Sequence, residues 1–344
     1  MISKRYSNID QLRFIAALTV AMAHLIISKK GLSLNLEILS SISVEVFFII
    51  SGFVLAPQIL KVAQSKNINN YKIFLIRRWY RTIPLYILSL VLTSIIIGQF
   101  LSFDFFKYLF FIQNFFKIVV NIDYFSISWS LSVEEWFYLI FPLFLFSFIK
   151  FLKFNNQKLI IYASILFIII IFLLRFINIE DNEWGSGVRR IVIYRLDSIV
   201  FGFILYFYKD KISDKILNKI SLLIGIFVAS VILYKILEIN ASKNLILYKI
   251  IFHYIVAFWG SLVVLLFYII DKKIKKSYLI KLNLFLGKIS YSIYLFHLLI
   301  IYIISLLNIS ILSSIFTFLL TQIIISSILY FYFEKPILKL RPSY

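Results

Sequence analysis

The sequence predicts an all-α integral membrane protein with about ten transmembrane helices and with both termini in the cytoplasm. Of its 344 residues, 62% are hydrophobic, and the mean hydropathy is +0.95. Soluble domains are only about 45–50% apolar. The apolar residues are grouped in blocks such as 158–175, and a block of about 20 residues matches a bilayer core of about 30 Å. Together these observations exclude a water-soluble protein.

Ten blocks have the composition and length of membrane spans. They cover residues 12–28, 38–60, 83–99, 129–149, 158–175, 191–208, 220–237, 250–270, 284–306 and 311–333. The stretch 104–118 is aromatic and too short to span, so we expect an interfacial or re-entrant segment there. No repeat and no Pro/Gly/Ser-rich linker is evident. We therefore expect one membrane-embedded domain over 1–344 and no additional soluble domain.

The first block has some features of a signal peptide, namely basic residues in front and a small-residue motif behind. Asp10 and Arg13 interrupt the front of the block, however, and apolar residues continue through Ile27. A cleaved signal has a shorter, uninterrupted apolar region. The pattern therefore favours a retained first helix.

The distribution of Lys and Arg sets the orientation. With the N-terminus inside, the inner loops and tails hold 23 of the 36 lysines and arginines, and the outer loops hold 8. Cytoplasmic loops are enriched in these residues, so both ends are predicted to lie inside. The same rule explains the net charge of +20 without any nucleic-acid partner.

The chain contains no cysteine. This excludes disulfides, thiolate metal sites and a cysteine acyl carrier. No cluster of other residues has the spacing of metal ligands, so we expect no bound metal.

Ionisable groups within a membrane cost about 2.5–3.5 kcal/mol each on insertion scales, so each calls for a structural or chemical reason. Arg13 and His24 are eleven residues apart, which places them on one helix face and about 16 Å apart along the axis. Glu45 of the second span is expected within about 5 Å of the depth of His24. A carboxylate there can fix the tautomer of the imidazole. Purely structural hydrogen bonds between helices explain these residues equally well from spacing alone.

Further polar residues are expected in the outer half of the membrane. Adjacent acids such as Glu134 and Glu135 point in different directions on a helix, so at most one faces a common centre. Arg195 and Asp197 are interpreted first as an internal ion pair, and His297 lies past the middle of its span.

At the inner mouth, three arginines precede the third span. Arg77, Arg78 and Arg81 lead up to Pro84, which suits the first turn of a helix. Guanidinium groups bind phosphate in a bidentate manner, whereas the alternative is ordinary anchoring by the positive-inside rule. Sorted by depth, these residues predict a polar cavity that a phosphate-bearing molecule enters from the cytoplasm.

Seven segments in order resemble the family-3 membrane acyltransferases, which include bacterial O-antigen and capsule O-acetyltransferases. They are IDQLRFIAALTVAMAH, SVEVFFIISGFVL, FLIRRWYRTIPLY, WSLSVEEWFYLIFP, YRLDSIVFG, LGKISYSIYLFHLLI and FEKP. The resemblance implies a ten-helix domain that transfers an acyl group from cytoplasmic acyl-CoA to a sugar hydroxyl at the outer face. It also implies that Arg13 and His24 are the essential pair of the first helix, and that Arg78 and Arg81 are the Arg-x-x-Arg of the third.

Two positions depart from the family pattern. Glu45 stands where aspartate is commoner, which lengthens the side chain by one methylene, and Trp136 stands where glutamine is usual.

The sequence thus predicts an O-acyltransferase in the bacterial plasma membrane. We expect His24 as general base, with Glu45 or Glu134 orienting it, and Arg13, Arg78 and Arg81 on the phosphates of acetyl-CoA, the donor substrate rather than a resident cofactor. The expected acceptor is a cell-surface polysaccharide or its lipid-linked precursor. An acyl-histidine intermediate stays open beside direct transfer. A flippase for lipid-linked saccharides, a small-molecule acceptor and a succinyl donor are the alternatives.

Overall fold

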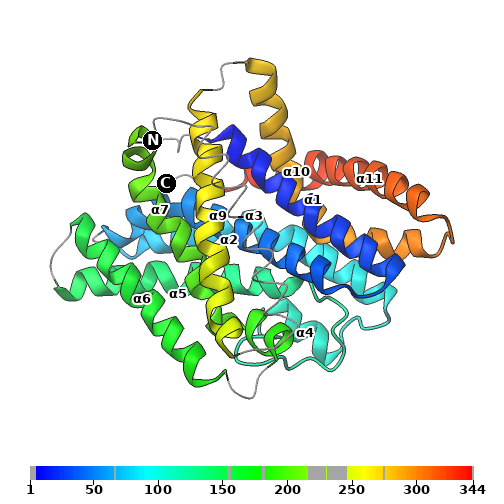
Figure 1. Cartoon of the computed structure of the whole chain (residues 1–344), viewed down its shortest axis with the longest axis horizontal. Coiled ribbons are helices and arrows are strands. Elements are labelled where there is room, and N and C mark those ends of the chain that lie inside the picture. The colour runs from blue at the N-terminus through cyan, green and yellow to red at the C-terminus, as the bar shows by residue number, and fades with distance from the viewer. Residues whose placement is uncertain are drawn as a thin grey trace. The chain divides into compact units, whose positions relative to one another are not determined.

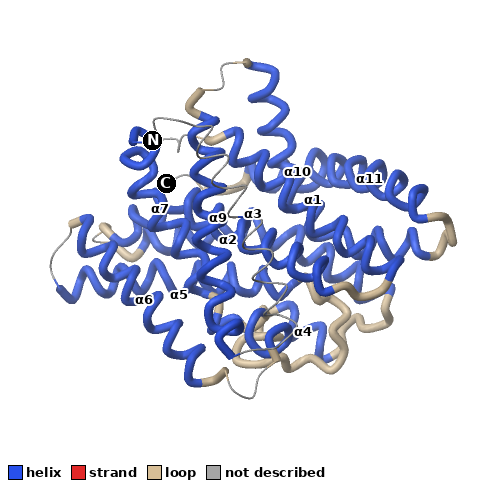
Figure 2. Tube along the Cα trace, in the orientation of Figure 1, coloured by secondary structure: helices blue, strands red, loops and turns tan. Residues whose placement is uncertain are grey.

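The computed structural model describes residues 5–65, 67–152, 156–179, 183–215, 230, 246–273 and 276–342. Helices joined by turns and loops make up these residues, and no strand occurs among them (Figure 2). The predicted all-α class is therefore confirmed.

The long helices follow the predicted spans (Figure 1). They are α1 (Ser7–Lys30), α2 (Leu34–Ala63), α3 (Asn69–Ile96), α5 (Ser128–Leu152), α6 (Gln157–Ile177), α7 (Leu196–Lys215), α9 (Ile246–Asp271), α10 (Ser277–Ser305) and α11 (Ile311–Ile328). Within the described residues, eight helical segments are long and apolar enough to cross a membrane. The predicted sixth span corresponds to α7, which is not among the eight because charged residues occupy its C-terminal part. The predicted seventh span, 220–237, lies outside the described residues except for residue 230.

The chain divides into two compact units. The first contains Met1–Ile50, Tyr208–Lys243 and Ile255–Pro336, and the second contains Ser51–Phe207, Asn244–Tyr254 and Ile337–Tyr344. The helices α2, α7 and α9 each contribute residues to both units.

In the first unit, α1 packs along α10. A Cβ atom added to Gly287 of α10 would lie 2.4 Å from the Cβ of Asp10, so only glycine permits this approach. Small residues allow close backbone contact between membrane helices. Asp271, at the end of α9, accepts hydrogen bonds from the Ser7 hydroxyl at 2.8 Å and from the Asn8 backbone N–H at 2.9 Å. A carboxylate from a second helix therefore caps the N-terminus of α1.

In the second unit, aromatic rings fill the space between helices. The ring of Phe141 lies 4.9 Å from that of Phe137, 5.1 Å from that of Phe203 and 5.2 Å from that of Phe167, measured between centroids. At Gly52 of α2, an added Cβ atom would overlap the backbone oxygen of Ile199 on α7. Aromatic side chains in stacked and edge-to-face contact, together with a close backbone approach at Gly52, thus form part of the interior of this unit.

The third helix begins earlier than the sequence predicts. The position of Pro84 suggested a helix start, but α3 begins at Asn69 and Pro84 lies within it. The arginine-rich segment continues the helix because its polar side chains do not interrupt backbone hydrogen bonding, and membrane helices tolerate internal proline. Arg78 and Arg81 consequently lie on one face of α3, three residues apart.

The aromatic stretch 104–118 does not form a long helix. A short helix, α4 (Phe103–Leu109), is followed by irregular backbone as far as α5. Ser102 caps α4 by accepting a hydrogen bond from the Phe105 N–H at 3.1 Å. Burial raises the pKa of Asp104, but hydrogen bonds from Lys107 and from the backbone N–H groups of Ile122 and Asn121 outweigh it and lower that pKa below its usual value. Asp104 thereby ties α4 to the following loop.

We expect cysteine labelling to confirm the orientation. Cysteines at Ser213 and Ser277 should react with an impermeant thiol reagent only from the cytoplasmic side, and a cysteine at Asn121 only from outside. Ser242, the outer position that the charge-based topology first suggested for this test, lies outside the described residues, so Asn121 takes its place. The native chain has no cysteine, so the background is zero. Labelling of positions 121 and 277 from the same side would contradict the charge-based topology.

Candidate active site

A pair of histidines lies in the first unit. His24 Nδ1 of α1 is 2.8 Å from His297 Nε2 of α10. The ring centroids are 5.0 Å apart with an interplanar angle of 19°. The distance between the centroids is close to the sum of the N···N distance and the radii of the two rings. The two nitrogens therefore lie on the line that joins the ring centroids. The contact is therefore an in-plane hydrogen bond rather than a face-to-face stack. His297 is fully buried, and His24 is partly exposed.

The second nitrogen of His297 fixes the direction of this bond. His297 Nδ1 lies 2.7 Å from the backbone oxygen of Tyr294. A carbonyl oxygen only accepts, so Nδ1 of His297 carries the proton, and Nε2 of a neutral ring is then an acceptor. His24 must donate to it from Nδ1. The Nε2 atom of a neutral His24 is thereby left with a lone pair, which is the form that a general base requires.

Arg13 lies on the same helix as His24. Its Nη1 atom is 3.3 Å from Asp10 Oδ1, and Asp10 Oδ2 is 2.6 Å from Arg5 Nε. The Arg13 side chain is 18% exposed. Asp10 thus orients Arg13 without burying it. Glu45 of α2, in the same unit, is 1% exposed.

The two adjacent glutamates of α5, in the second unit, face different neighbours. Glu134 accepts a hydrogen bond from Ser51 of α2. Glu135 accepts one from Thr82 of α3 at 2.6 Å and is 5% exposed. The two side chains point in different directions, as expected for consecutive positions of a helix. Glu134 is the more accessible of the two.

The arginines of α3 lie in the second unit. Arg78 Nη2 donates to Gln58 Oε1 at 3.1 Å, and Arg77 donates to the backbone oxygen of Pro342. Arg78 and Arg81 are both partly exposed. The predicted site residues thus divide between the units, with Arg13, His24 and Glu45 in the first and Arg78, Arg81 and Glu134 in the second.

The internal ion pair of the second unit includes a partner that the sequence does not suggest. Both carboxylate oxygens of Asp197 accept from Arg175 Nη2, at 2.8 and 2.7 Å, while Arg195, the partner expected from the sequence, is also electrostatically coupled to Asp197. The hydroxyl of Tyr254 donates to the same carboxylate at 2.9 Å. Arg175 lies in the last turn of α6, and its Nε and Nη2 atoms also donate to the backbone oxygen of Tyr194, which holds the guanidinium beside Asp197.

Two contacts could not be found from spacing. The pattern places His297 past the middle of its span but gives no sign that it meets His24, because the two lie 273 residues apart. Glu334 sits in a stretch of π-helix (Leu329–Glu334), is 5% exposed and accepts a hydrogen bond from Ser292. In the sequence, only the FEKP segment pointed to Glu334. Single π-helical turns are frequent at functional sites.

The chain was compared with known proteins. A model of the acyltransferase domain family matches residues 6–332. O-acetyltransferase OatA of Staphylococcus aureus is 27% identical over 326 residues, which are 86% of this chain and 51% of that protein. Peptidoglycan O-acetyltransferase OatA of Listeria monocytogenes is 32% identical over 178 residues, which are 46% of this chain and 27% of that protein. No solved structure matches the chain significantly.

The matched regions cover only part of these relatives, about half of the length of the S. aureus protein. The family model, in contrast, extends over this chain from the start of α1 into the π-helical turn after α11. Six of the seven segments that predicted the resemblance lie within the matched range, and FEKP, residues 333–336, follows directly after it. The chain therefore belongs to the acyltransferase domain family, as a multi-pass bacterial membrane protein.

Proposed function

We propose that this protein transfers an acyl group, most simply acetyl, from cytoplasmic acyl-CoA to a sugar hydroxyl of a cell-envelope saccharide. Family membership and the names of the O-acetyltransferase relatives support the transfer reaction. They favour an enzyme over a flippase. The peptidoglycan named for the Listeria relative makes an amino-sugar glycan, or its lipid-linked precursor, the leading acceptor.

The observation that carries the proposal is the hydrogen-bond chain from His24 through His297 to the Tyr294 carbonyl. It gives His24 a defined tautomer with Nε2 free of a proton. This is the role that Glu45 was expected to play. The role of Glu45, buried in the same unit, remains a prediction, as does that of Glu134 in the other.

In the proposed reaction, His24 Nε2 accepts the proton of the acceptor's sugar hydroxyl. The oxygen of that hydroxyl attacks the carbonyl carbon of the thioester at the same time. A C–O ester bond forms and the C–S bond breaks. The proton then passes from His24 to the sulfur of the leaving CoA. General-base catalysis of this kind contributes about 10²–10⁴ in rate. In the two-step route, the same Nε2 atom carries the acyl group before the hydroxyl attacks.

The donor would be held through its phosphates. Arg78 and Arg81 share a face of α3, and Arg13 is held in position by Asp10. Guanidinium forks match phosphate oxygens.

We expect the Arg78→Ala, Arg81→Ala double variant to bind CoA much more weakly. Each lost charge-assisted contact costs roughly 1.5–3 kcal/mol, or about ten- to a hundredfold in affinity. Titration of the purified protein with CoA by calorimetry measures this directly. Lys72→Ala is the matched control, because it removes one positive charge from an exposed position on the same helix. Unchanged CoA affinity in a correctly inserted double variant would reduce the two arginines to membrane anchors.

The reaction itself is tested in proteoliposomes with acetyl-CoA labelled in its acetyl group. Label should pass to an added cell-wall glycan and should be released as acetate by mild base, as expected for an ester. In cells, deletion of the gene should remove one acetyl mass from a surface glycan. Labelling of the glycan at the same level without the protein would reject the proposed function.

A further inference from the structure

The segment that follows α12 (Lys335–Lys339) contacts α3 within the second unit. Arg77 of α3 donates a hydrogen bond to the backbone oxygen of Pro342. Adjacent Cα atoms are about 3.8 Å apart, so Arg341 lies directly beside this contact. Arg77 and Arg341 are both half-buried. Two arginines from distant parts of the chain are thus brought together near the start of α3.

The same contact adds positive charge to a region that already has an excess of it. Residues 61–81, 150–158 and 337–344 are the inner segments of this unit in the predicted topology. They contain eleven lysines and arginines and no aspartate or glutamate. Glu135 of α5 is electrostatically coupled to Arg78 and offsets only one of these charges. Guanidinium groups repel one another, so an arrangement that collects them favours a polyanionic ligand.

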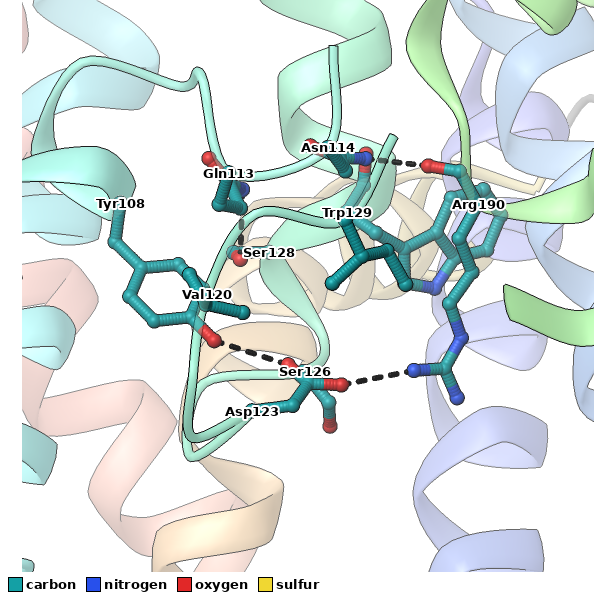
Figure 3. A pocket seen from close by; sticks show the side chains of 10 residues that line it. Tyr108, Gln113, Asn114, Val120, Asp123, Ser126, Ser128, Trp129 and Arg190 are labelled. Carbon is teal, nitrogen blue, oxygen red and sulfur yellow. Dashed lines mark hydrogen bonds and ion pairs between the residues drawn. The ribbon is translucent and has the colours of Figure 1, made fainter. Parts of the chain in front are cut away.

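Arginines at the outer end of this unit differ, because acidic side chains neutralise them. Beside the small pocket between α4 and α5, Arg190 donates to Asp123 at 2.9 Å (Figure 3). Arg175 is paired with Asp197 at 2.7 Å. An arginine that completes an ion pair needs no external anion. The inner segments, rather than these outer pairs, are therefore where an anionic ligand is expected.

We propose that Arg341 binds the 3′-phosphate of the donor, CoA. The inference rests on the proposed function, in which acyl-CoA is the donor. CoA carries phosphate at two separate places, a diphosphate in the middle of the molecule and a monophosphate on the ribose. Arg78 and Arg81 share one face of α3 and suit the diphosphate, because guanidinium forks match phosphate oxygens. The monophosphate then requires a cation of its own.

The position of Arg341 fits the ribose end of the donor. Arg77, which contacts the next residue, Pro342, lies four residues before Arg81. It is therefore about 6 Å nearer to the cytoplasmic end of α3 in the predicted topology. A donor that enters from the cytoplasm with its thioester leading leaves its adenosine end, with the 3′-phosphate, nearest to the cytoplasm. Arg77 is thus a positioning residue, which holds the segment with Arg341 at the level of that phosphate.

The test compares CoA with 3′-dephospho-CoA, which lacks only the monophosphate. Calorimetry gives the affinity of the purified protein for each. The unmodified protein should bind CoA at least about tenfold more tightly, the equivalent of one charge-assisted contact. Arg341→Gln should lose this preference, because its affinity for CoA falls while its affinity for 3′-dephospho-CoA is unchanged. Lys339→Gln removes the same charge from an exposed position two residues away and should keep the preference.

Two double variants separate the roles of the other arginines. Arg77→Ala releases the segment and should reduce the preference for CoA, but the Arg77→Ala, Arg341→Gln double variant should bind CoA no more weakly than Arg341→Gln alone. The Arg78→Ala, Arg81→Ala double variant should weaken the binding of both ligands equally, because both carry the diphosphate. A further loss of CoA affinity when Arg77→Ala is added to Arg341→Gln would contradict a role for Arg77 that acts only through Arg341.

A preference for CoA that survives in Arg341→Gln overturns the proposal, and this is the result expected if Arg341 only anchors the chain to anionic lipid headgroups. An equal loss of affinity for both ligands in Arg341→Gln, loss of the preference in Lys339→Gln, or no preference in the unmodified protein overturns it as well. These outcomes leave the proposed function intact. If the unmodified protein binds neither ligand, the proposed acyl-CoA donor itself is rejected.

Discussion

The His24→Gln protein is expected to lose acyl transfer by about 10²–10⁴-fold while it inserts normally and binds CoA with unchanged affinity. Glutamine can replace the hydrogen bond that His24 makes to His297, but its amide accepts no proton at neutral pH. A purely structural His24 predicts a different outcome. Hydrogen bonds between membrane helices contribute only about 0.6 kcal/mol on average, so losing one should hardly change activity. Initial rates with labelled acetyl-CoA and excess acceptor distinguish the two.

His297→Gln is the matched control for this experiment. Its amide oxygen can still accept from His24 Nδ1, so the variant should keep a substantial part of the rate, whereas His297→Leu should lose more of it because the His24 tautomer is no longer fixed. Because the pH profile of the remaining activity reports the titration of His24, a shifted profile in the His297 variants would support the hydrogen-bond chain. Near-normal transfer by His24→Gln would eliminate His24 as base and as acyl carrier.

The sequence predicted the elements of this fold better than their contacts. Apolar block length located most of the described spans, because the bilayer requires about 20 apolar residues, but α10 begins seven residues before its predicted start and α7 ends seven residues after its predicted end. The predicted start of α3 was wrong, because the sequence around a proline does not show whether that proline lies within a membrane helix or in its first turn. The pocket between α4 and α5 was not predicted at all. Its chain is irregular, and no periodicity marks which of its side chains converge.

For the candidate site, local reasoning identified residues but not their partners. Arg13 and His24 share a face of one helix, which the helical repeat alone specifies. The partner of His24 depends on which helix packs against α1, and the close approach at Gly287 selects α10. A single sequence does not show that this one glycine, among many small and apolar residues, marks the helix that packs against α1. For the same reason, nothing in the sequence indicates that Asp197 pairs with Arg175, which lies 22 residues before it.

The Asp197→Ala protein is expected to be destabilised by about 3–5 kcal/mol, the largest stability effect that we expect for a single substitution. The Arg175 side chain is 0% exposed, and its Nη2 atom contacts both carboxylate oxygens of Asp197. Removal of the carboxylate leaves a buried guanidinium charge without compensation, and water cannot reach it. The free energy of unfolding, measured by titration of detergent-solubilised protein with sodium dodecyl sulfate, gives the effect directly.

Two further variants show whether burial is the cause. Asp123→Ala breaks the Arg190 ion pair, whose side chains are 29% and 40% exposed, and should cost no more than about 1 kcal/mol because solvent screens that pair. The Arg175→Leu, Asp197→Leu double variant removes both charges and should recover much of the stability that Asp197→Ala loses. If Asp197→Ala and Asp123→Ala cost the same, then solvent reaches Arg175 as readily as Arg190. The network of Arg175, Asp197 and Tyr254 would then not be a buried constraint on the ends of α6, α7 and α9.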